Sequence, residues 1–356
     1  MSDALQTPAG RRFAWKEWLM TPWTITIAAP LLVAALDPGK YDVVPVHVAH
    51  DGRWLPAEFA NGVLNADENG PELALLPGGR GRLLAIGPDG ARELPPVGML
   101  FPVLHGLHGE DGAVQGLAEV ACVPLAGCGI LGSATSIDKD VAKRLLRDAG
   151  LPVARSLVIR EEQIPPLAEL EAKLGLPVFV KPARQGSSVG VSKVETEADY
   201  AAALAEGFKH DGKLLAEEFV DGREIEFAVL EDPQGGLTVS RPGEIVPAES
   251  HGFYTYDAKY VDADGAALNI PADLPEAVEA NLRDMAAKAF RAAGCDAMAR
   301  VDFFVTQDFR CLVNEINTIP GFTDISMYSK AMAASGIPYP ELLDRLVEHG
   351  LARAAR

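Results

Sequence analysis

Two short stretches near the carboxyl end of the chain constrain its fold more than any other feature. Residues 299–305 and 311–317 each alternate apolar side chains with polar or β-branched ones, and the short polar segment 306–309 separates them. Two runs with a period of two, joined by a short turn, predict a pair of antiparallel strands. We therefore expect a β-hairpin here.

One face of this hairpin carries side chains that suit a cation. Because side chains alternate along a strand, Arg300 and Asp302 share one side of the first strand. Glu315 and Asn317 share one side of the return strand, and the short turn puts Glu315 roughly opposite the aspartate. Two carboxylates and a carboxamide suit a hard cation such as Mg²⁺, which usually binds together with phosphate. The alternative is an edge hairpin with a solvated polar face.

Charge, cysteine content and length narrow the class of protein. The chain has 356 residues and a net charge of −18, which argues against nucleic acid and against an anionic membrane surface as partners. A polyanion would have to bind in a local basic pocket. The four cysteines show no CxxC spacing, and in a chain of this size they indicate reduced thiols in a cytosolic protein. The length is sufficient for roughly two or three domains.

The amino-terminal region superficially resembles a secretion signal. Two adjacent arginines, Arg11 and Arg12, precede a largely apolar run over residues 18–36. Pro22 and Pro30 interrupt this run, which continues directly into a predicted turn and strand, so we do not expect a cleaved signal. No other stretch approaches the ~18 consecutive apolar residues that a membrane span requires.

A buried strand followed by a glycine-rich loop indicates a first ligand-binding segment. The apolar run 97–104 ends in the loop 105–112, which begins with His105, and a helix is expected over residues 113–121. In parallel sheets, a strand, a glycine loop and a helix commonly present a ligand at the carboxyl end of the strand. Taken alone this motif is weak, and a structural histidine in a turn is the alternative.

A second glycine loop gives a sharper signal. The apolar strand expected over residues 177–182 delivers Lys181, and the loop 183–191 that follows contains Ser187 and Ser188 among its glycines. Backbone N–H groups and hydroxyls of such a loop can surround a phosphate while the lysine neutralises its charge. Because the lysine precedes the glycines, this is not a P-loop. A flexible β-turn is the alternative.

The rest of the chain is expected to alternate helices and strands. Further helices are predicted over residues 28–36, 133–147, 167–174, 197–206 and 275–293, with two more at the carboxyl end, and further strands over 41–48, 153–160, 213–220, 224–230 and 237–246. Residues 52–95 are rich in Gly, Pro and polar side chains, and they are predicted to be a surface excursion with only short strands. The aromatic and polar segment 248–260 is predicted to be an ordered loop with a functional role.

Taken together, these segments resemble the D-alanine–D-alanine ligases of the ATP-grasp superfamily. The resemblance extends from about residue 31 to the carboxyl end, and its motifs occur in the family's order. The motifs are Leu104-His105-Gly106 with Gly109-Glu110-Asp111-Gly112, Asp138-Lys139-Asp140, Lys181-Pro182 through Gly190, Gly222-Arg223-Glu224, Tyr256-Asp257-Ala258-Lys259-Tyr260, Arg300-Val301-Asp302 and Asn314-Glu315-Ile316-Asn317-Thr318-Ile319-Pro320-Gly321-Phe322. It implies a multidomain α/β (α+β) fold, with a doubly wound N-terminal domain over residues 1–130 and an ATP-grasp fold built from two domains, 131–217 and 218–356.

The resemblance implies that ATP binds between the central and C-terminal domains, with divalent cations beside it. The residues it assigns to ATP are Lys139, Lys181 and Lys259 on the phosphates, Ser188 in the phosphate loop, Glu217, Glu218, Phe219 and Val220 at the adenine, and Glu224 on the ribose. It assigns two Mg²⁺ (or Mn²⁺) ions to Asp302, Glu315 and Asn317, which agrees with the hairpin face described above.

The implied reaction joins two D-alanines to D-alanyl-D-alanine for peptidoglycan synthesis. The carboxylate of the first D-alanine attacks the γ-phosphate of ATP, and the amine of the second attacks the resulting acyl phosphate. The resemblance places Arg300 and the Gly321 N–H at the oxyanion, His105 near the first substrate, Ser326 and Met327 near the carboxylate of the second, and Ser187 with Tyr260 across the closed loops. It further implies a cytoplasmic homodimer whose partners are small molecules.

The side chain at position 260 bears on the choice of the second substrate. In the family, tyrosine at this position accompanies dipeptide formation, and phenylalanine accompanies D-alanyl-D-lactate formation. Tyr260 therefore favours an amine nucleophile. D-Serine stays open as an alternative second substrate.

The amino-terminal segment departs from the family pattern. The family begins with a strand, a Gly-Gly loop and a Ser-x-Glu-His-x-x-Ser segment, whose glutamate pairs with the ammonium of the first D-alanine. Here residues 21–25 stand in that place, and Thr21 offers a hydroxyl rather than a charge. An ammonium group without a counter-charge in a closed site is costly.

Three interpretations of this departure stay open. The first-substrate site is rebuilt, or it is lost, or residues 1–27 reflect an error in the gene model of an ordinary ligase. The functional alternatives to D-alanine ligation are an ATP-grasp ligase of a different amino acid and an ATP-binding pseudoenzyme.

Overall fold

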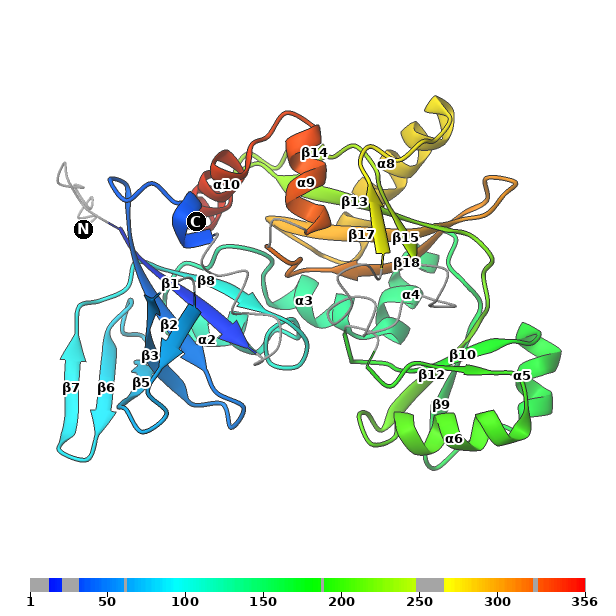
Figure 1. Ribbon diagram of the computed structural model, residues 1–356, viewed down its shortest axis with the longest axis horizontal. Coiled ribbons are helices and arrows are strands. Elements are labelled where there is room, and N and C mark those ends of the chain that lie inside the picture. Colours follow the sequence, from blue (N-terminus) through cyan, green and yellow to red (C-terminus); the bar gives the residue numbers. More distant parts are fainter. Residues whose placement is uncertain are drawn as a thin grey trace.

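The alternating and continuous apolar runs of this chain become strands of several sheets, with helices packed against them (Figure 1). The computed structural model describes residues 13–20, 32–60, 63–186, 189–247, 266–322 and 326–355. Among these residues the strands form sheets of five, four, six and three strands. The mixed α/β architecture expected from the sequence is confirmed.

The five-stranded sheet has the order β4-β3-β2-β1-β8. Strand β1 (Phe13–Met20) runs parallel to both β2 (Tyr41–Val48) and β8 (Met99–Leu104). All residues of β8 are buried, as expected for a parallel strand covered on both faces. Strand β1 was not predicted, because two charged residues interrupt its apolar pattern. Of the helix predicted over 28–36, residues 32–35 are helical, and 28–31 lie outside the described residues.

Most described residues between 52 and 95 form strands, so the surface excursion predicted for them is wrong. The strands are β3 (Trp54–Ala60), β4 (Val63–Ala66), β5 (Glu72–Leu75), β6 (Leu83–Gly87) and β7 (Gly90–Leu94). β3 and β4 extend the first sheet, whereas β5, β6 and β7 form a separate antiparallel sheet. Leu75 and Leu83 are buried in one core with Leu100 of β8. The short strands expected here are present, but each is too short to show from its period which side faces a core.

Asp138 ends one helix and begins the next, so the single helix predicted over residues 133–147 is wrong. The helices in this part of the chain are α2 (Ala113–Val120), α3 (Ile130–Ile137) and α4 (Lys139–Asp148). Asp138 has an extended backbone (φ −84°, ψ 98°), and its carboxylate accepts the N–H groups of Asp140 and Val141. An aspartate at this position satisfies donors that a helix start leaves unpaired. Gly150 follows α4 with φ +71°, a conformation that glycine favours after a helix.

The four-stranded sheet has the order β11-β10-β12-β9 and carries two helices (Figure 1). Its elements are β9 (Ser156–Arg160), α5 (Leu167–Leu174), β10 (Val178–Pro182), β11 (Ser192–Val194), α6 (Glu197–Gly207) and β12 (Lys213–Glu218). Val178 and Val180 of β10 are buried with the apolar side chains of both helices. Because side chains alternate, Phe179 and Lys181 lie on the opposite face, and Glu217 pairs with Phe179 across the strands.

The six-stranded sheet contains the predicted hairpin and is antiparallel. Its elements are β13 (Arg223–Glu231), β14 (Leu237–Val239), β15 (Gly243–Pro247), β16 (Ala266–Asn269), α8 (Glu276–Ala292), β17 (Met298–Val305) and β18 (Cys311–Asn317). Val301 and Phe303 pack in the core with α8. Arg300 and Asp302 alternate with them and therefore lie on the other face. The predicted register is confirmed, because Asp302 is the Cα partner of Glu315.

Two segments correct the strand predictions for this sheet. The single strand predicted over 237–246 is divided into β14 and β15, which Ser240, Arg241 and Pro242 separate. Proline has no N–H to donate to a neighbouring strand, and the Pro242 carbonyl accepts the Ala272 N–H at 2.8 Å. The helices predicted over 113–121, 167–174, 197–206 and 275–293 are confirmed to within one residue at either end.

The last two helices connect the carboxyl end of the chain to its amino-terminal sheet (Figure 1). They are α9 (Met327–Ala334) and α10 (Tyr339–Ala354). Leu342 and Leu346 of α10 share one buried core with Met99 and Phe101 of β8. The Arg353 guanidinium donates to the Leu125 carbonyl at 2.8 Å. The last helix of the chain therefore shares one core with the amino-terminal sheet.

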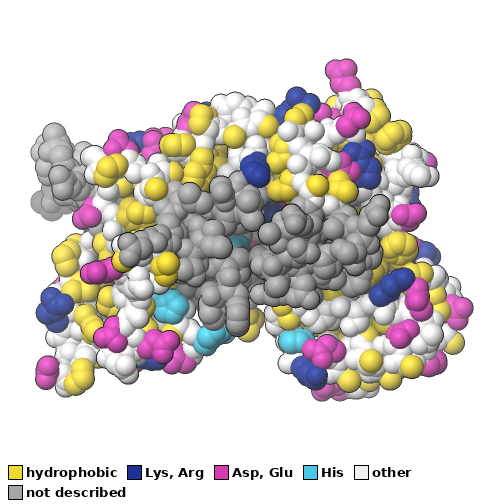
Figure 2. Space-filling model, viewed as in Figure 1, with side chains coloured by type: hydrophobic (Ala, Val, Ile, Leu, Met, Phe, Trp, Pro, Cys, Tyr) yellow, Lys and Arg dark blue, Asp and Glu magenta, His cyan; other side chains and the backbone are white. Residues whose placement is uncertain are grey.

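On the face shown in Figure 2, the coloured Lys and Arg side chains are scattered among Asp and Glu side chains rather than gathered in a patch. None of the described helices combines the length and the apolar character needed to span a membrane.

Candidate active site

The acidic face of the hairpin is organised around Asp302. The Arg300 guanidinium donates from Nε and Nη2 to the two Asp302 oxygens, both at 2.8 Å, and Asn317 Nδ2 donates to Asp302 Oδ2 at 2.8 Å. Glu226 of β13 lies 3.0 Å from Arg300 Nε through its Oε2 atom. Charge-assisted bonds of this kind are strong and directional. Two carboxylates therefore fix the direction in which the guanidinium points.

The residues predicted to bind a metal are brought together on this face. Glu315 is the Cα partner of Asp302 across the hairpin, and Asn317 is hydrogen-bonded to Asp302. Two carboxylates and a carboxamide provide the hard oxygen ligands that Mg²⁺ accepts. Within the described ranges, no three His, Cys, Asp or Glu side chains are arranged around one metal position. The donor set therefore fits a cation that completes its shell with phosphate oxygens and water.

A cavity of about 390 Å³ lies between the four-stranded and the six-stranded sheets. Its walls come from β10, β12 and the loop after β10 on one side, and from β13, β15, β17 and β18 on the other. The residues assigned to ATP that line it are Lys139, Lys181, Glu217, Glu218, Phe219, Val220 and Glu224. Glu315 of the hairpin lines it as well. The structure thus gathers these predicted residues around one space.

A buried carboxylate joins two lysines at this cavity. Glu217 Oε1 lies 2.6 Å from Lys181 Nζ, and Glu217 Oε2 lies 2.6 Å from Lys143 Nζ. Burial alone would raise the pKa of Glu217, but the two ammonium groups outweigh it and hold that pKa below its usual value. The resemblance assigns Lys181 to the phosphates and Glu217 to the adenine, and in the structure these two side chains form an ion pair.

Lys143 is a residue of this site that sequence reasoning missed. It follows Lys139 by four positions on α4, so both lysines lie on the same face of the helix. The Lys143 side chain is 1% exposed, and burial lowers its pKa although Glu217 opposes the shift. The spacing of the two lysines was the available signal.

Lys139 reaches from α4 to the glycine loop after β10. Its Nζ donates to the Gln185 carbonyl oxygen at 2.6 Å. Burial lowers the pKa of Lys139, and the Glu315 carboxylate opposes that shift. A smaller cavity beside Lys139 is lined by Glu110, Gly186 and Glu315. Both glycine loops and the hairpin therefore meet around this amine.

Burial shifts two titratable groups of the glycine loop after β8. It lowers the pKa of His105 to about 4, and the positive charge of Arg300 adds to the shift. It raises the pKa of Glu110 to about 7, which the Gly106 N–H opposes by donating to Glu110 Oε2 at 2.6 Å. His105 is therefore an uncharged imidazole at neutral pH, close to the guanidinium predicted to bind the oxyanion. Glu110 belongs to one of the family motifs, but the sequence predicts no role for it.

The residues predicted near the second substrate lie together at the start of α9. A Cβ atom added to Gly321 would lie 2.9 Å from Ser326 Oγ, so the predicted oxyanion N–H and the predicted substrate hydroxyl are neighbours. The Met327 side chain is buried and lies against Gly243 of β15. Any ligand contact of Met327 would therefore come from its backbone.

Comparison with protein families agrees with this geometry. The model of the D-ala D-ala ligase N-terminus matches residues 26–128, and the model of the D-ala D-ala ligase C-terminus matches residues 145–348. The chain belongs to the D-alanine–D-alanine ligase family. Within this family, D-alanine–D-alanine ligase A of Brucella suis is 61% identical over 330 residues, which cover 92% of this chain and 94% of that protein. The family expected from the sequence motifs is confirmed.

Solved structures of the ligase family share the fold. The D-alanine-D-alanine ligase from Coxiella burnetii superposes with a TM-score of 0.81 at 32% identity, covering 97% of this chain and 95% of that one. The VanG D-Ala:D-Ser ligase from Enterococcus faecalis also gives a TM-score of 0.81, at 29% identity, covering 96% and 100%. The ATP-grasp fold with its N-terminal domain is therefore confirmed.

Several ligase-family residues predicted for the site cannot be placed. Thr21, Ser187, Ser188, Lys259 and Tyr260 lie outside the described residues. The functional loop predicted over 248–260 lies outside them as well. Their roles stay predictions.

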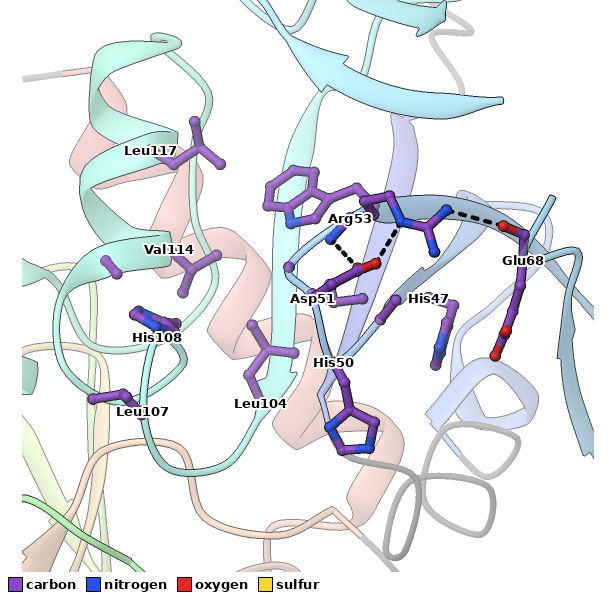
Figure 3. Close-up of a pocket in the computed structure, with 15 residues that line it drawn as sticks. His47, His50, Asp51, Arg53, Glu68, Leu104, Leu107, His108, Val114 and Leu117 are labelled. Carbon is purple, nitrogen blue, oxygen red and sulfur yellow. Dashed lines mark hydrogen bonds and ion pairs between the residues drawn. The ribbon is translucent and has the colours of Figure 1, made fainter. Parts of the chain in front are cut away.

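This family member has a second cavity, of about 840 Å³, on its N-terminal sheet (Figure 3). It lies between the β2–β3 turn and α2, and its histidines are His47, His50 and His108. Arg53 is engaged within it: Nε donates to Asp51 Oδ2 at 2.7 Å, and Nη1 donates to the Glu68 carbonyl oxygen at 2.9 Å. Asp111 Oδ1, next to the cavity, accepts the N–H of Ala113, the first residue of α2, at 2.9 Å. The guanidinium and the helix start on its walls therefore already have carboxylate partners.

Proposed function

We propose that the chain is an ATP-dependent, ADP-forming ligase that joins two D-alanines to D-alanyl-D-alanine for peptidoglycan precursor synthesis. One observation carries the proposal: lysines suited to phosphate and a hairpin carboxylate suited to a cation line the same cavity. Family membership supports this function over the alternatives of a different amino-acid substrate or a pseudoenzyme.

In the proposed mechanism, the site orients two displacement steps. The first D-alanine carboxylate attacks the γ-phosphate of ATP, so an acyl phosphate forms and ADP leaves. The amine of the second D-alanine then attacks the acyl carbon, and phosphate leaves. Arg300 would stabilise the oxyanion together with the Gly321 N–H. Asp302 fixes the orientation of the Arg300 guanidinium through two hydrogen bonds of 2.8 Å.

Divalent cations belong to the proposal as well. Asp302, Glu315 and Asn317 would hold two Mg²⁺ or Mn²⁺ ions, whose chemistry is to neutralise the negative charge of the phosphates. The lysines of the cavity add positive charge from the chain itself. Lys139 and Lys181 both line that cavity.

The division of the chain is also proposed. Domains over residues 1–130, 131–217 and 218–356 are supported by the sheets, because the four-stranded sheet lies within 156–218 and the six-stranded sheet within 223–317. A cytoplasmic homodimer is proposed from the family resemblance alone.

The functional test is phosphate release from Mg·ATP with D-alanine as the sole amino acid. We expect release with D-alanine and none with L-alanine. Adding D-serine to limiting D-alanine would increase release if D-serine serves as the second substrate. Nucleotide binding without release for any of these amino acids would refute the ligase function and favour the pseudoenzyme.

A further inference from the structure

A buried ion pair adjoins the first residue of the glycine loop after β10. The Lys213 ammonium, at the start of β12, donates to both Asp138 oxygens, with distances of 2.7 and 2.6 Å from Nζ to Oδ1 and Oδ2. The two side chains are 9% and 13% exposed. Neither residue lines the nucleotide cavity. The pair therefore has no part in the mechanism described above.

Backbone hydrogen bonds connect the same two residues to Lys139. Asp138 caps the helix that Lys139 begins. The Lys139 N–H donates to the Ala183 carbonyl at 2.9 Å, and the Ala183 N–H donates to the Lys213 carbonyl at 2.9 Å. Lys213, Asp138, Lys139 and Ala183 thus form a closed ring across the start of α4, the end of β10 and the start of β12.

A second carboxylate stabilises this ring. Asp211 accepts the Lys213 N–H at 3.0 Å and the Arg184 N–H at 2.9 Å. The Arg184 guanidinium also pairs with Asp211, with an Nη2–Oδ1 distance of 2.5 Å. The first two residues of the glycine loop are therefore hydrogen-bonded directly, Ala183 to Lys213 and Arg184 to Asp211.

The amine of Lys139 projects from this ring into the nucleotide cavity. Its Nζ reaches the Gln185 carbonyl at 2.6 Å, two residues beyond Ala183 on the glycine loop. The segments that carry the amine and its acceptor are thus both tied to the Lys213–Asp138 pair. Removing one partner of a buried ion pair leaves the other charge uncompensated, which disturbs the backbone that the pair holds.

We propose that Lys213 is a positioning residue for the nucleotide: its ion pair with Asp138 holds the Lys139 amine toward the phosphates and thereby sets the affinity for ATP. The inference rests on the proposed function in taking ATP as the ligand of the cavity. It concerns nucleotide binding alone and does not require that ligation occurs.

The test measures binding of a non-hydrolysable ATP analogue with Mg²⁺ by titration calorimetry. We expect Lys213→Met to raise Kd about tenfold, the scale on which a lost buried charge contact changes affinity. Lys139→Met is expected to raise Kd at least as much. If Lys213 acts through Lys139, the double variant binds no more weakly than Lys139→Met alone. Effects that multiply in the double variant would overturn the proposal.

A matched control separates positioning from a general loss of stability. Arg353 forms a half-buried ion pair with Asp296 at 2.9 Å, remote in sequence from the glycine loop. Arg353→Met is expected to lower the melting temperature and to leave Kd within twofold of wild type. An equal weakening of binding in this control would refute a specific role for Lys213.

Two further measurements keep the outcome decisive. If Lys213→Met does not fold, the same cycle is run with Asp138→Asn. Its amide oxygen can still accept the N–H groups at the start of α4, while the carboxylate at 2.6–2.7 Å from Lys213 is gone and Asp140, at 3.4 Å, stays. A wild-type protein that binds the analogue but releases no phosphate with D-alanine would refute the proposed function and leave the binding cycle valid. An analogue Kd in Asp138→Asn equal to wild type would refute the positioning role.

Discussion

At the scale of single residues, the site fixes its charged groups by pairing them with one another. Asp302 orients Arg300, and Glu217 separates the two ammonium groups of Lys143 and Lys181. An unpaired charge in such a buried place would be costly, and hydrogen-bonded pairing reduces that cost. These paired side chains are therefore held in place before a ligand arrives.

Substituting Glu315 by glutamine tests the cation site. The change keeps the size of the side chain and removes one of the two hairpin carboxylates, so we expect D-alanine-dependent phosphate release to fall by about 100-fold or more. Asp308→Asn, in the exposed turn of the same hairpin, is expected to change the rate less than twofold. Near-normal activity of Glu315→Gln would exclude the hairpin as the cation site.

The neutral state of His105 predicts a pH effect on stability. Burial lowers its pKa from 6.5 to about 4, so between these values the unfolded chain binds more protons at this residue than the folded chain. The free energy of unfolding that His105 contributes is therefore lost as the pH falls from about 6.5 toward 4. Urea titrations of wild type and His105→Gln should show the wild type losing more stability over this interval. Parallel curves would contradict the shifted pKa.

At the scale of elements, close helix packing depends on single glycines. A Cβ atom on Gly132 of α3 would lie 2.5 Å from Cys128 Sγ and 2.7 Å from the Cys295 Cα atom. Cys295 lies in the turn after α8, so α3 sits against the end of another helix. Gly116 of α2 has open space at the same atom, with no neighbour within 4 Å. The two helical glycines thus differ in environment and not in backbone role.

Alanine substitutions at these glycines should have opposite signs. Gly132→Ala is expected to lower the free energy of unfolding by about 1–3 kcal/mol, because the added methyl group would push α3 away from Cys128 and Cys295. Gly116→Ala should raise it by roughly 0.5–1 kcal/mol, because alanine favours a helix and nothing opposes it here. Chemical denaturation measures both. Equal effects would show that packing around Gly132 relaxes freely.

At the scale of the whole molecule, the structure has separate hydrophobic cores, which differ in how far apart in the sequence their residues lie. One core combines β8 with α10 and also includes Met298 of β17. The described residues that are buried in the core of the four-stranded sheet all lie between Ile159 and Ala216. The first core therefore couples distant parts of the chain, whereas the second belongs to one sheet and its helices.

Two matched leucines test this arrangement. Leu346 of α10 and Leu170 of α5 are both 0% exposed, and either change to alanine should cost about 2–5 kcal/mol. Native-state hydrogen exchange should show Leu346→Ala lowering amide protection in both β8 and β17. Leu170→Ala should lower it in β10 and β12 and leave β8 unchanged. Loss of protection throughout the molecule in both variants would mean that the cores unfold as one.

The sequence predicted those strands and helices in which the pattern of apolar side chains extends over enough residues to show a period. The hairpin alternates over two runs, which is enough to set its register, and the pairing of Asp302 with Glu315 followed. The strands between 52 and 95 have four to seven residues each and left no readable period. Asp138 broke a helix that periodicity alone would continue, because a cap acts through one side chain that a pattern of apolar positions does not register.

The sequence predicted the residues expected to bind ATP better than the residues that position them. Lys181 precedes a glycine loop, and family motifs identify both Lys181 and Lys139. Lys143 and Lys213 act through contacts between segments distant in sequence, with Lys213 pairing across 75 positions to Asp138. The spacing from Lys139 could have pointed to Lys143, but no local pattern shows which distant carboxylate either lysine contacts. Residues that bind the nucleotide can therefore be found from sequence motifs, whereas the residues that position them are found only once the fold is known.

The charges around the nucleotide cavity have a consequence for how fast the nucleotide arrives. The chain carries a net charge of −18, so it repels an anion such as ATP unless salt screens the repulsion. Among the described residues that line the cavity, six carboxylates stand against three basic side chains, so the repulsion continues up to the place of contact. Added salt should therefore accelerate ATP association, where it normally slows the binding of opposite charges.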